Sequence, residues 1–426
     1  MQADLLIVNI GELATTVGHS DRPQCGSELG KLAIYQDSFL AVKAGRILAL
    51  GPMAESEQYR GPDTEVIDAE GKAVLPGFVD PHTHLVFDGW RERELAMKLA
   101  GKPYLEILAA GYGILSTVRA TRQASLELLV QDAKQSLDRM LLHGTTTVEA
   151  KSGYGLTTES ELKQLQAARQ ADQEHPVDIV STFLGAHAVP PEYKHDSEAF
   201  VDLLIEEMLP AVAAQDLATF CDVFCEQGVF SIEQSRRILQ AAKKHGFKLK
   251  LHADEIVALG GAELAAELGA TSADHLLQAS PAGIKAMADT GVIAVLLPAT
   301  SFTLRSAKGA DAAAMLEAGC AIALATDFNP GTCPTESMQI VQTMAWQVLG
   351  LTPAQALAAS TINSAHAIGV ANEVGSLEVG KAADFVIYDA PNLDFVAYHF
   401  GVNLAQHVFK HGRQVVRAGH LCYSEI

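Results

Sequence analysis

The sequence predicts an α/β fold, in which a (β/α)8 barrel of the TIM type carries a small composite β-sandwich built from the N- and C-terminal segments. Short apolar runs alternate with amphipathic helical stretches between about residues 74 and 350. These runs are eight in number, which indicates a closed barrel rather than an open doubly wound sheet. Both ends of the chain instead hold alternating runs separated by turns. We therefore expect a barrel over residues 74–370, flanked by sandwich segments 1–73 and 371–426.

The apolar runs predict the barrel strands in chain order. Each run is nearly continuous in apolar residues, as expected of parallel strands that helices cover on both faces. Helical stretches between the runs end at glycines such as Gly144 and Gly246, which suit a C-cap. No glycine-rich nucleotide-binding motif follows any run, so a nucleotide fold has no support. The predicted strands span residues 75–85, 145–151, 177–187, 220–229, 248–255, 271–277, 292–300 and 321–331.

Two similar hairpin sequences, one in each terminal segment, predict the composite domain. SFLAVKAGRILALG turns at Ala44-Gly45-Arg46, and HVFKHGRQVVRAG turns at His411-Gly412-Arg413. Since both ends of the chain are rich in such strands, we expect them to meet as one small β-sandwich.

Charge and composition exclude several kinds of partner. The chain has 51 acidic and 31 basic residues, a formal net charge of −20. That field repels nucleic acid and anionic membranes, and no apolar run is long enough to span a bilayer. The amino terminus lacks a basic leader, and the six cysteines are scattered as in a reduced protein. We expect a cytoplasmic protein that acts on a small molecule.

Residues of metal-ligand type occur at the ends of several predicted strands. His82 and His84 are two positions apart on the first strand, so their imidazoles share a face. His252 ends the fifth strand, His275 lies on the sixth and Asp327 ends the eighth. The carboxyl ends of all barrel strands converge on one mouth. Three imidazoles and one carboxylate suit zinc or iron with a position left for water. We assign His82, His84, His252 and Asp327 as ligands, and His275 as an acid or base beside them.

These motifs resemble the amidohydrolase superfamily and, within it, the imidazolonepropionase family. SGYGL, GAHAVPPEY and DFNPGT are the most specific of the matching segments, which run through the whole predicted barrel. The resemblance implies a homodimer that hydrolyses the cyclic amide 4-imidazolone-5-propanoate to N-formimidoyl-L-glutamate. The matching segments are PGFVDPHTHLVFDGWRERE, EAKSGYGL, FLGAHAVPPEY, LHADE, ADHL, LPATSF and ATDFNPGTCPTESM.

The resemblance also implies a single metal. Binuclear members of the superfamily carry a carboxylated lysine on strand four, but the fourth predicted strand here, FCDVFCEQG, has no lysine. Lys151 ends strand two and is interpreted as support for the following loop. Glu226 lies on strand four, but one carboxylate without a bridging group is weak support for a second ion. We expect one Zn²⁺ or Fe³⁺ ion per subunit.

Ordinary site chemistry predicts roles for the residues beside the metal. A bound ion lowers the pKa of its water and gives hydroxide at neutral pH. Asp327 would take a proton from that water, and His275 would hydrogen-bond the developing oxyanion. Glu255, just after His252, would relay a proton to the departing ring nitrogen.

A substrate carboxylate needs a cation in so acidic a protein. Arg91, just after the first strand, can offer it a bidentate fork. Arg93 and Arg119 are interpreted instead as surface arginines. By resemblance, the residues that contact substrate or product are Arg91, Tyr104, Tyr154, His187, Glu255, Asn329, Gly331 and Thr332.

Two other functions stay open at this point. A deaminase of a purine- or pyrimidine-like ring would use the same ligand pattern. Arg91→Ala would separate the two, because it should raise KM for an anionic substrate and hardly affect a neutral base. A non-catalytic metal-binding or assembly protein is the other possibility. The extra His275 and Glu255 favour catalysis, and metal analysis with chelation and re-addition would test it.

Overall fold

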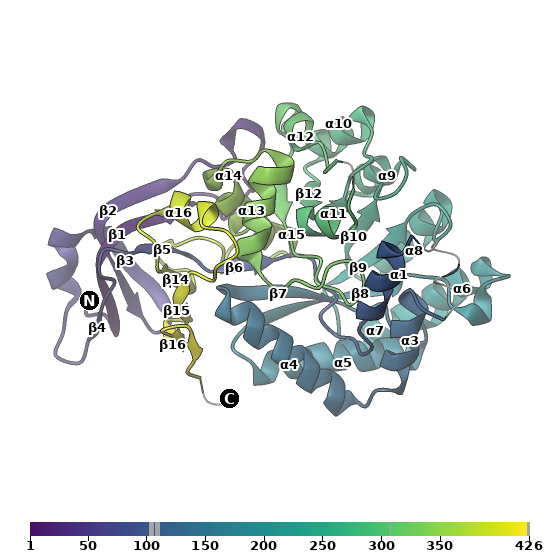
Figure 1. Ribbon diagram of the computed structural model, residues 1–426, viewed down its shortest axis with the longest axis horizontal. Helices are drawn as coiled ribbons and strands as arrows, with labels where there is room; N and C mark the ends of the chain where they lie inside the picture. Colours follow the sequence, from purple (N-terminus) through teal and green to yellow (C-terminus); the bar gives the residue numbers. More distant parts are fainter. Residues whose placement is uncertain (102–105, 107–110, 307, 424–426) are drawn as a thin grey trace.

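Two sheets organise the molecule, a parallel barrel and a mixed sheet (Figure 1). The structure is a computed structural model that describes the chain except residues 102–105, 107–110, 307 and 424–426. The barrel strands follow one another in chain order and pair in parallel, which confirms the predicted barrel. They are β6 (Phe78–Asp80), β7 (Thr145–Lys151), β8 (Asp178–Ala186), β9 (Phe220–Cys225), β10 (Lys248–Ala253), β11 (Ser272–His275), β12 (Ile293–Leu296) and β13 (Ile322–Leu324).

Most observed strands are shorter than the predicted ones, because the apolar runs continue into the loops at the barrel mouth. Only Phe78–Asp80 of the first predicted strand is a barrel strand, and His82 and His84 lie beyond it. The run 292–300 ends in α11 (Pro298–Thr303) rather than as strand. Proline at the first helical position favours a helix start there.

The barrel closes between its first and last strands through the segments that follow them. Thr83 and Phe328 form a parallel bridge. The amide of His84 donates to the carbonyl of Phe328 at 2.8 Å, and the amide of Asp327 donates to the carbonyl of His82 at 3.0 Å. This seam therefore brings the first two histidines and Asp327 together by backbone pairing alone.

Helices surround the barrel, and their ends follow local sequence signals. In α8 the side chain of Ser231 forms a capping box with Gln234, and the helix is followed by Gly246 at φ 89°. The α-helices are α1 (Glu92–Leu99), α3 (Ile114–Gln123), α4 (Leu126–Leu142), α5 (Thr158–Glu174), α6 (Ser197–Leu203), α7 (Leu209–Ala214), α8 (Ile232–Lys244), α9 (Gly261–Leu268), α10 (Pro281–Thr290), α11, α12 (Ala312–Ala318), α13 (Met338–Leu349), α14 (Pro353–Ala359), α15 (Ile362–Ala367) and α16 (Leu393–Tyr398). A π-helical turn (Leu204–Met208) joins α6 to α7, and short 3₁₀ helices span Gly26–Glu28, Met53–Tyr59 and Pro191–Tyr193.

The two terminal segments build one mixed sheet, as expected of a composite domain. Its order is β17-β16-β15-β14-β5-β1-β2-β3, and β4 pairs with β1. β5 from the N-terminal segment pairs antiparallel with β14 from the C-terminal segment, which joins the two ends of the chain. The strands are β1 (Leu5–Thr15), β2 (Ala33–Lys43), β3 (Arg46–Pro52), β4 (Glu65–Asp68), β5 (Ala73–Pro76), β14 (Phe385–Tyr388), β15 (Ala405–Lys410), β16 (Arg413–Arg417) and β17 (His420–Leu421).

Both predicted hairpins are present in this sheet. Lys43 pairs with Arg46 across the first turn, and Lys410 pairs with Arg413 across the second. The turns also touch each other, since a β-carbon on Gly45 would lie 3.0 Å from the carbonyl oxygen of His411. The exact residues at which the domains divide stay a prediction.

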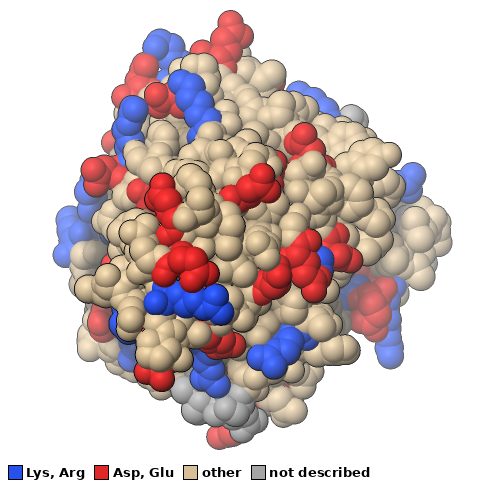
Figure 2. Space-filling model, turned by 90° about the vertical axis from the view of Figure 1, so that its left-hand side faces the viewer, with Lys and Arg blue, Asp and Glu red and all other residues tan. Residues whose placement is uncertain are grey.

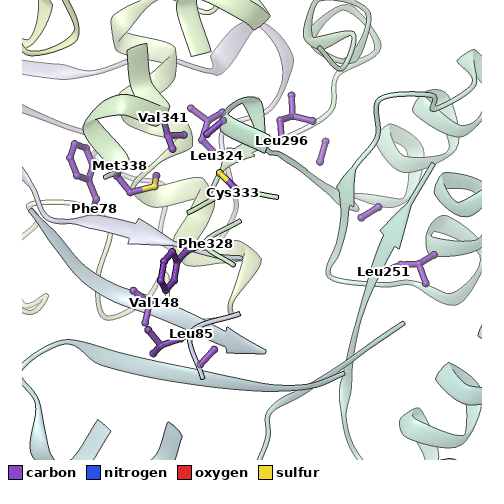
Figure 3. Packing of buried hydrophobic residues seen from close by; sticks show 14 of the residues in the cluster. Phe78, Leu85, Val148, Leu251, Leu296, Leu324, Phe328, Cys333, Met338 and Val341 are labelled. Carbon is purple, nitrogen blue, oxygen red and sulfur yellow. The ribbon is translucent and has the colours of Figure 1, made fainter. Parts of the chain in front are cut away.

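A continuous apolar core joins the barrel to its helices. Figure 3 shows Phe78 beside Met338, and Phe328 near Val148 and Leu85. These side chains are buried. The core therefore packs directly behind the loops that carry His82 and Asp327.

The molecular surface carries both signs of charge. Figure 2 shows basic and acidic side chains interspersed over the end of the molecule that the mixed sheet forms. Among the residues that the structure describes, no helix combines the length and apolarity needed to cross a membrane.

Candidate metal-dependent active site

The four predicted metal ligands come together at the barrel mouth. The rings of His82 and His84 are 5.4 Å apart between centroids, and the ring of His252 is 4.5 Å from that of His82. Oδ1 of Asp327 lies 3.6 Å from Nε2 of both His82 and His84. The pairing of the segments after β6 and β13, together with the end of β10, thus brings these ring nitrogens and the carboxylate oxygen close together.

The central nitrogen atoms of this set are left without protein partners. Nε2 of His82 and Nε2 of His252 are buried and make no hydrogen bond to any described residue. Burial lowers the pKa of His82 and of His84 well below the usual value, so both rings are neutral with a lone pair to share. Ligand atoms of His82, His84 and His252 lie within 4.8 Å of one another. Three imidazoles in this arrangement could hold a metal ion, which binds their neutral form.

Two buried aspartates contact the outer nitrogens of these rings. Oδ2 of Asp274 lies 2.6 Å from Nδ1 of His82, and Oδ2 of Asp222 lies 2.9 Å from Nδ1 of His252. Burial acts to lower the pKa of His252, but the Asp222 carboxylate outweighs it and the pKa is raised. Asp274 therefore holds the His82 ring from behind by a hydrogen bond. Asp222 faces the His252 ring as an ion-pair contact, because Nδ1 of His252 makes no hydrogen bond to a described residue.

Lys151 points into the barrel instead of supporting the surface loop, as the sequence had suggested. Its Nζ lies 2.7 Å from Oδ2 of Asp222 and 2.9 Å from Oε2 of Glu149, and the side chain is fully buried. Burial opposes its charge, but Asp222, Glu149 and Asp274 raise the pKa of Lys151 above its ordinary value. The three carboxylates therefore favour the charged ammonium form of Lys151.

His275 and Glu255 stand beside the donor set. The ring of His275 is 5.2 Å from that of His252, and its Nδ1 lies 3.7 Å from Oε1 of Glu255. Burial lowers the pKa of His275 to about 4 and raises the pKa of Glu255 to about 7. His275 is thus neutral at neutral pH, whereas Glu255 can exchange a proton there. His275 and Asp327 have φ values of 77° and 56°, a conformation that non-glycine residues keep only when their surroundings hold it.

Arg91 lies across the loop that follows β13. Its amide donates to the carbonyl of Pro330 at 3.1 Å. Its guanidinium passes so close over Gly331 that a β-carbon there would lie 1.2 Å from Nη2. The side chain is 9% exposed and also lines an open hollow of about 800 Å³. The guanidinium of Arg91 can lie in this position because Gly331 has no side chain.

Tyr154 and His187 line the same mouth. The ring of His187 stacks on that of His84 at 4.7 Å between centroids, and Tyr154 lies 5.2 Å from His187. Burial lowers the pKa of His187 to about 3 and raises the pKa of Tyr154 above its ordinary value. Both side chains are neutral and offer hydrogen bonds rather than charge.

Two side chains of α5 hold the loop that carries Tyr154. Glu161 accepts hydrogen bonds from three backbone amides within residues 153–156, at 2.7 to 3.0 Å. Gln164 accepts from the amide of Tyr154 at 3.0 Å and donates to the carbonyl of Val86 at 2.6 Å. Gln164 thus ties the Tyr154 loop to the segment that leads to the arginine.

The loop after β13 is organised by Asn329. Its Oδ1 accepts from the amides of Gly331 and Thr332 at 2.9 and 2.7 Å, and its Nδ2 donates to the carbonyl of Asp327 at 2.7 Å. The side chain of Asn329 is therefore used within the loop. Tyr104, the remaining predicted contact, lies outside the described residues.

The other residues weighed in the sequence lie away from the donor set. Arg93 is 78% exposed, and Arg119 is exposed and donates to the carbonyl of Gly111, so both are surface arginines as interpreted. Glu226 is buried, and its Oε2 accepts from the amide of Ile256 at 2.9 Å. It braces the loop that carries Glu255.

Comparison with known proteins identifies the family. The profile of the Amidohydrolase family matches residues 73–416. The chain is 54% identical over 422 residues to the imidazolonepropionase of Alkaliphilus oremlandii, covering 99% of this chain and 100% of that one. It is 51% identical over 423 residues to the imidazolonepropionase of Streptococcus gordonii, covering 99% and 100%. The chain belongs to the imidazolonepropionase family of amidohydrolases.

Solved structures share the fold of this imidazolonepropionase-family chain. An adenosine deaminase from Xanthomonas campestris with bound zinc has a TM-score of 0.71 at 21% identity, covering 99% of this chain and 94% of that one. The guanine deaminase of E. coli has a TM-score of 0.74 at 16% identity, covering 97% and 98%. At these identities the likeness shows the architecture alone.

Sequence reasoning missed the residues that support the site in this member of the imidazolonepropionase family. Asp222 and Asp274 are buried within barrel strands, and a charge buried in a strand needs a partner. That signal could have found both. Thr300, whose Oγ1 donates to Oδ2 of Asp327 at 2.7 Å, and Gln164 carry no such signal.

Proposed function

We propose that this chain hydrolyses the ring C–N bond of 4-imidazolone-5-propanoate to give N-formimidoyl-L-glutamate. The observation that carries the proposal is the placement of Arg91 at the same mouth as the imidazole and carboxylate donors. A hydrolytic centre beside a fixed guanidinium suits a cyclic amide that bears a carboxylate. The chain is 54% and 51% identical to two imidazolonepropionases over 99% of its length, which supports the same substrate.

His82, His84, His252 and Asp327 would hold one Zn²⁺ or Fe³⁺ ion per subunit. The unpartnered Nε2 atoms of His82 and His252 support this choice, because buried nitrogen acceptors are otherwise hydrogen-bonded. When bound, such an ion supplies Lewis acidity, which lowers the pKa of water and stabilises negative charge on a carbonyl oxygen.

The protein's own groups would move the protons. Asp327, whose pKa is raised by burial, accepts the proton of the attacking water while Thr300 holds its other oxygen. His275 donates a hydrogen bond to the carbonyl oxygen as charge develops there. Glu255, with a pKa of about 7, delivers a proton to the departing ring nitrogen.

The substrate's propanoate would lie against Arg91, with Tyr154, His187 and Tyr104 around the carboxylate or ring. Neutral His187 and Tyr154 add hydrogen bonds without a second charge. Asn329, Gly331 and Thr332 would contact the product; since the Asn329 side chain is used within its loop, that loop presents mainly backbone.

The test supplies freshly generated substrate to metal-replete protein and follows the loss of its ultraviolet absorbance. We expect turnover, and we expect Arg91→Ala to raise KM strongly, while Arg22→Ala, a change to an arginine of the N-terminal segment that is 68% exposed, has no effect. Absence of turnover beside a working control enzyme would overturn the specific activity. An Arg91→Ala enzyme with unchanged KM would remove the carboxylate clamp and favour a neutral ring.

We also propose that the enzyme is a cytoplasmic homodimer. This proposal rests on the membership of the chain in the imidazolonepropionase family. Light scattering coupled to size exclusion would check this, because a subunit has a mass of 45.3 kDa and a dimer twice that. Fractionation of cells would check the compartment.

A further inference from the structure

A cluster of buried ions fills the barrel interior behind the proposed metal ligands. Its members are Glu149, Lys151, Asp222, Lys250 and Asp274, and each side chain is 0% exposed. Paired ions in a protein interior rarely stabilise a fold more than apolar packing of the same volume would. The cluster therefore calls for a role other than stability.

The cluster meets the site through two of its carboxylates. Oδ2 of Asp274 is hydrogen-bonded to Nδ1 of His82 at 2.6 Å, and its other oxygen accepts from the hydroxyl of Ser272 at 2.6 Å. Asp222 faces Nδ1 of His252 at 2.9 Å, and its other oxygen accepts from the backbone amides of His252 and Val223 at 3.2 and 2.7 Å. Both carboxylates are thus anchored on the side away from the imidazole.

The two lysines hold these carboxylates in place. Nζ of Lys151 lies 2.7 Å from Asp222 and 3.5 Å from Asp274, so one ammonium bridges the two. Nζ of Lys250 lies 3.9 Å from Asp274 and donates to the carbonyl of Pro81 at 2.8 Å. Pro81 directly precedes His82, so the same lysine also holds the backbone that carries the first ligand.

We infer that Asp222 and Asp274, bridged by Lys151, are positioning residues that set which nitrogen of His252 and of His82 faces the metal. A neutral imidazole carries its proton on one nitrogen and its lone pair on the other. A carboxylate behind Nδ1 keeps the proton there and leaves Nε2 to bind the ion. This inference rests on the metal site of the proposed function.

Glu149 provides the control for charge alone. It belongs to the same cluster and lies 2.9 Å from each lysine nitrogen. Its Oε1 also accepts from the hydroxyl of Thr182 at 2.5 Å, so its bonds run to the lysines and a hydroxyl rather than to an imidazole. Glu149 lies within 4.8 Å of the His82–Asp274 pair, so Glu149→Gln removes a buried negative charge close to a ligand without removing a hydrogen bond to its ring.

The experiment measures metal affinity of the full-length apoprotein by competition with a chromophoric chelator, using Zn²⁺. We expect Asp274→Asn and Asp222→Asn to weaken binding about 10- to 100-fold each. Glu149→Gln should weaken it much less. Asp384→Asn, at a buried aspartate 2.5 Å from Lys410 in the mixed sheet, should leave affinity unchanged. Thermal melting of each apoprotein checks that it is folded.

Wild-type affinity in Asp274→Asn and Asp222→Asn would overturn the inference, as would an equal loss in Glu149→Gln. A second measurement needs neither variant: nitrogen NMR of histidine-labelled apoprotein should show the His82 signal, assigned by its absence in His82→Ala, with the proton on Nδ1. A proton on Nε2 would also overturn it. Wild-type protein that binds no zinc would instead contradict the proposed function.

Discussion

The barrel and the mixed sheet bury different chemistry. The barrel interior holds charged side chains, with Lys151 between Asp222 and Glu149 as its centre. The mixed sheet buries mainly apolar side chains, such as Phe385 and Phe409, whose rings stack at 4.4 Å. Paired buried ions add little net stability, whereas apolar packing adds much. The comparison teaches that the sheet is organised for stability and the barrel interior for its site, so changes in the two regions should have separable effects.

The largest expected effect lies in the barrel. Asp327→Asn keeps the shape of the side chain but removes the proton acceptor, so we expect kcat to fall about 10²- to 10⁴-fold. Because burial already disfavours the charged form of Asp327, the melting temperature of the apoprotein should not fall. Steady-state kinetics and calorimetry on one preparation check this. A variant that loses stability in step with activity would break the distinction between the regions.

The opposite pattern is expected in the mixed sheet. Phe385→Ala removes a ring that is 0% exposed and leaves a cavity, which should cost about 3–5 kcal/mol of unfolding free energy. The folded fraction should keep the kcat and KM of the wild type. Denaturant unfolding and kinetics at low temperature measure the two quantities. A large change in kcat of the folded protein would show that the sheet is coupled to the chemistry.

A smaller effect should separate binding from chemistry within the mouth itself. Gly331→Ala places a β-carbon where the Arg91 guanidinium lies, and the flexible arginine should move away rather than unfold the loop. Loss of its charged hydrogen bonds to the substrate corresponds to about a 10- to 100-fold rise in KM. Melting temperature and metal content should stay as in the wild type. An unchanged KM would mean that Arg91 does not depend on this glycine.

The smallest effect concerns a partly exposed pair, Asp178 of β8 in the barrel and His411 in the turn between β15 and β16 of the mixed sheet. Oδ1 of Asp178 lies 3.8 Å from Nε2 of His411 and raises the pKa of that histidine, so the folded protein binds the proton more tightly than the unfolded chain. The resulting stability is fully present below the usual histidine pKa of 6.5 and is lost as pH rises through the higher folded value. His411→Gln should therefore lower the melting temperature slightly in acid and not at alkaline pH. The reverse dependence on pH would contradict the assignment.

More of the fold than of the site could be predicted from the sequence. Eight apolar runs and two hairpin turns were enough for the barrel and the composite domain, because both depend on periodicity. His82, His84, His252 and Asp327 could be grouped because parallel strand ends share one mouth. Their roles stay predictions.

The direction of a side chain and its contacts with residues distant in the chain could not be predicted from the sequence. Lys151 faces the barrel interior, where its partner Asp222 comes from a strand that is distant in the chain. The hydrogen bond from Gln164 to the carbonyl of Val86 likewise joins residues that are distant in the chain, so no local sequence pattern predicts it. The close pass of Arg91 over Gly331 depends on the fold of the whole mouth.

The central claim is that the barrel mouth opens the ring of an imidazolone by hydrolysis. The most direct measurement is mass spectrometry of the product formed in ¹⁸O-labelled water, with a parallel assay for ammonia. The account predicts a ring-opened product that carries a solvent oxygen in its new carboxylate, with no ammonia released. Release of ammonia from an intact ring, or no reaction by metal-replete protein, would contradict it.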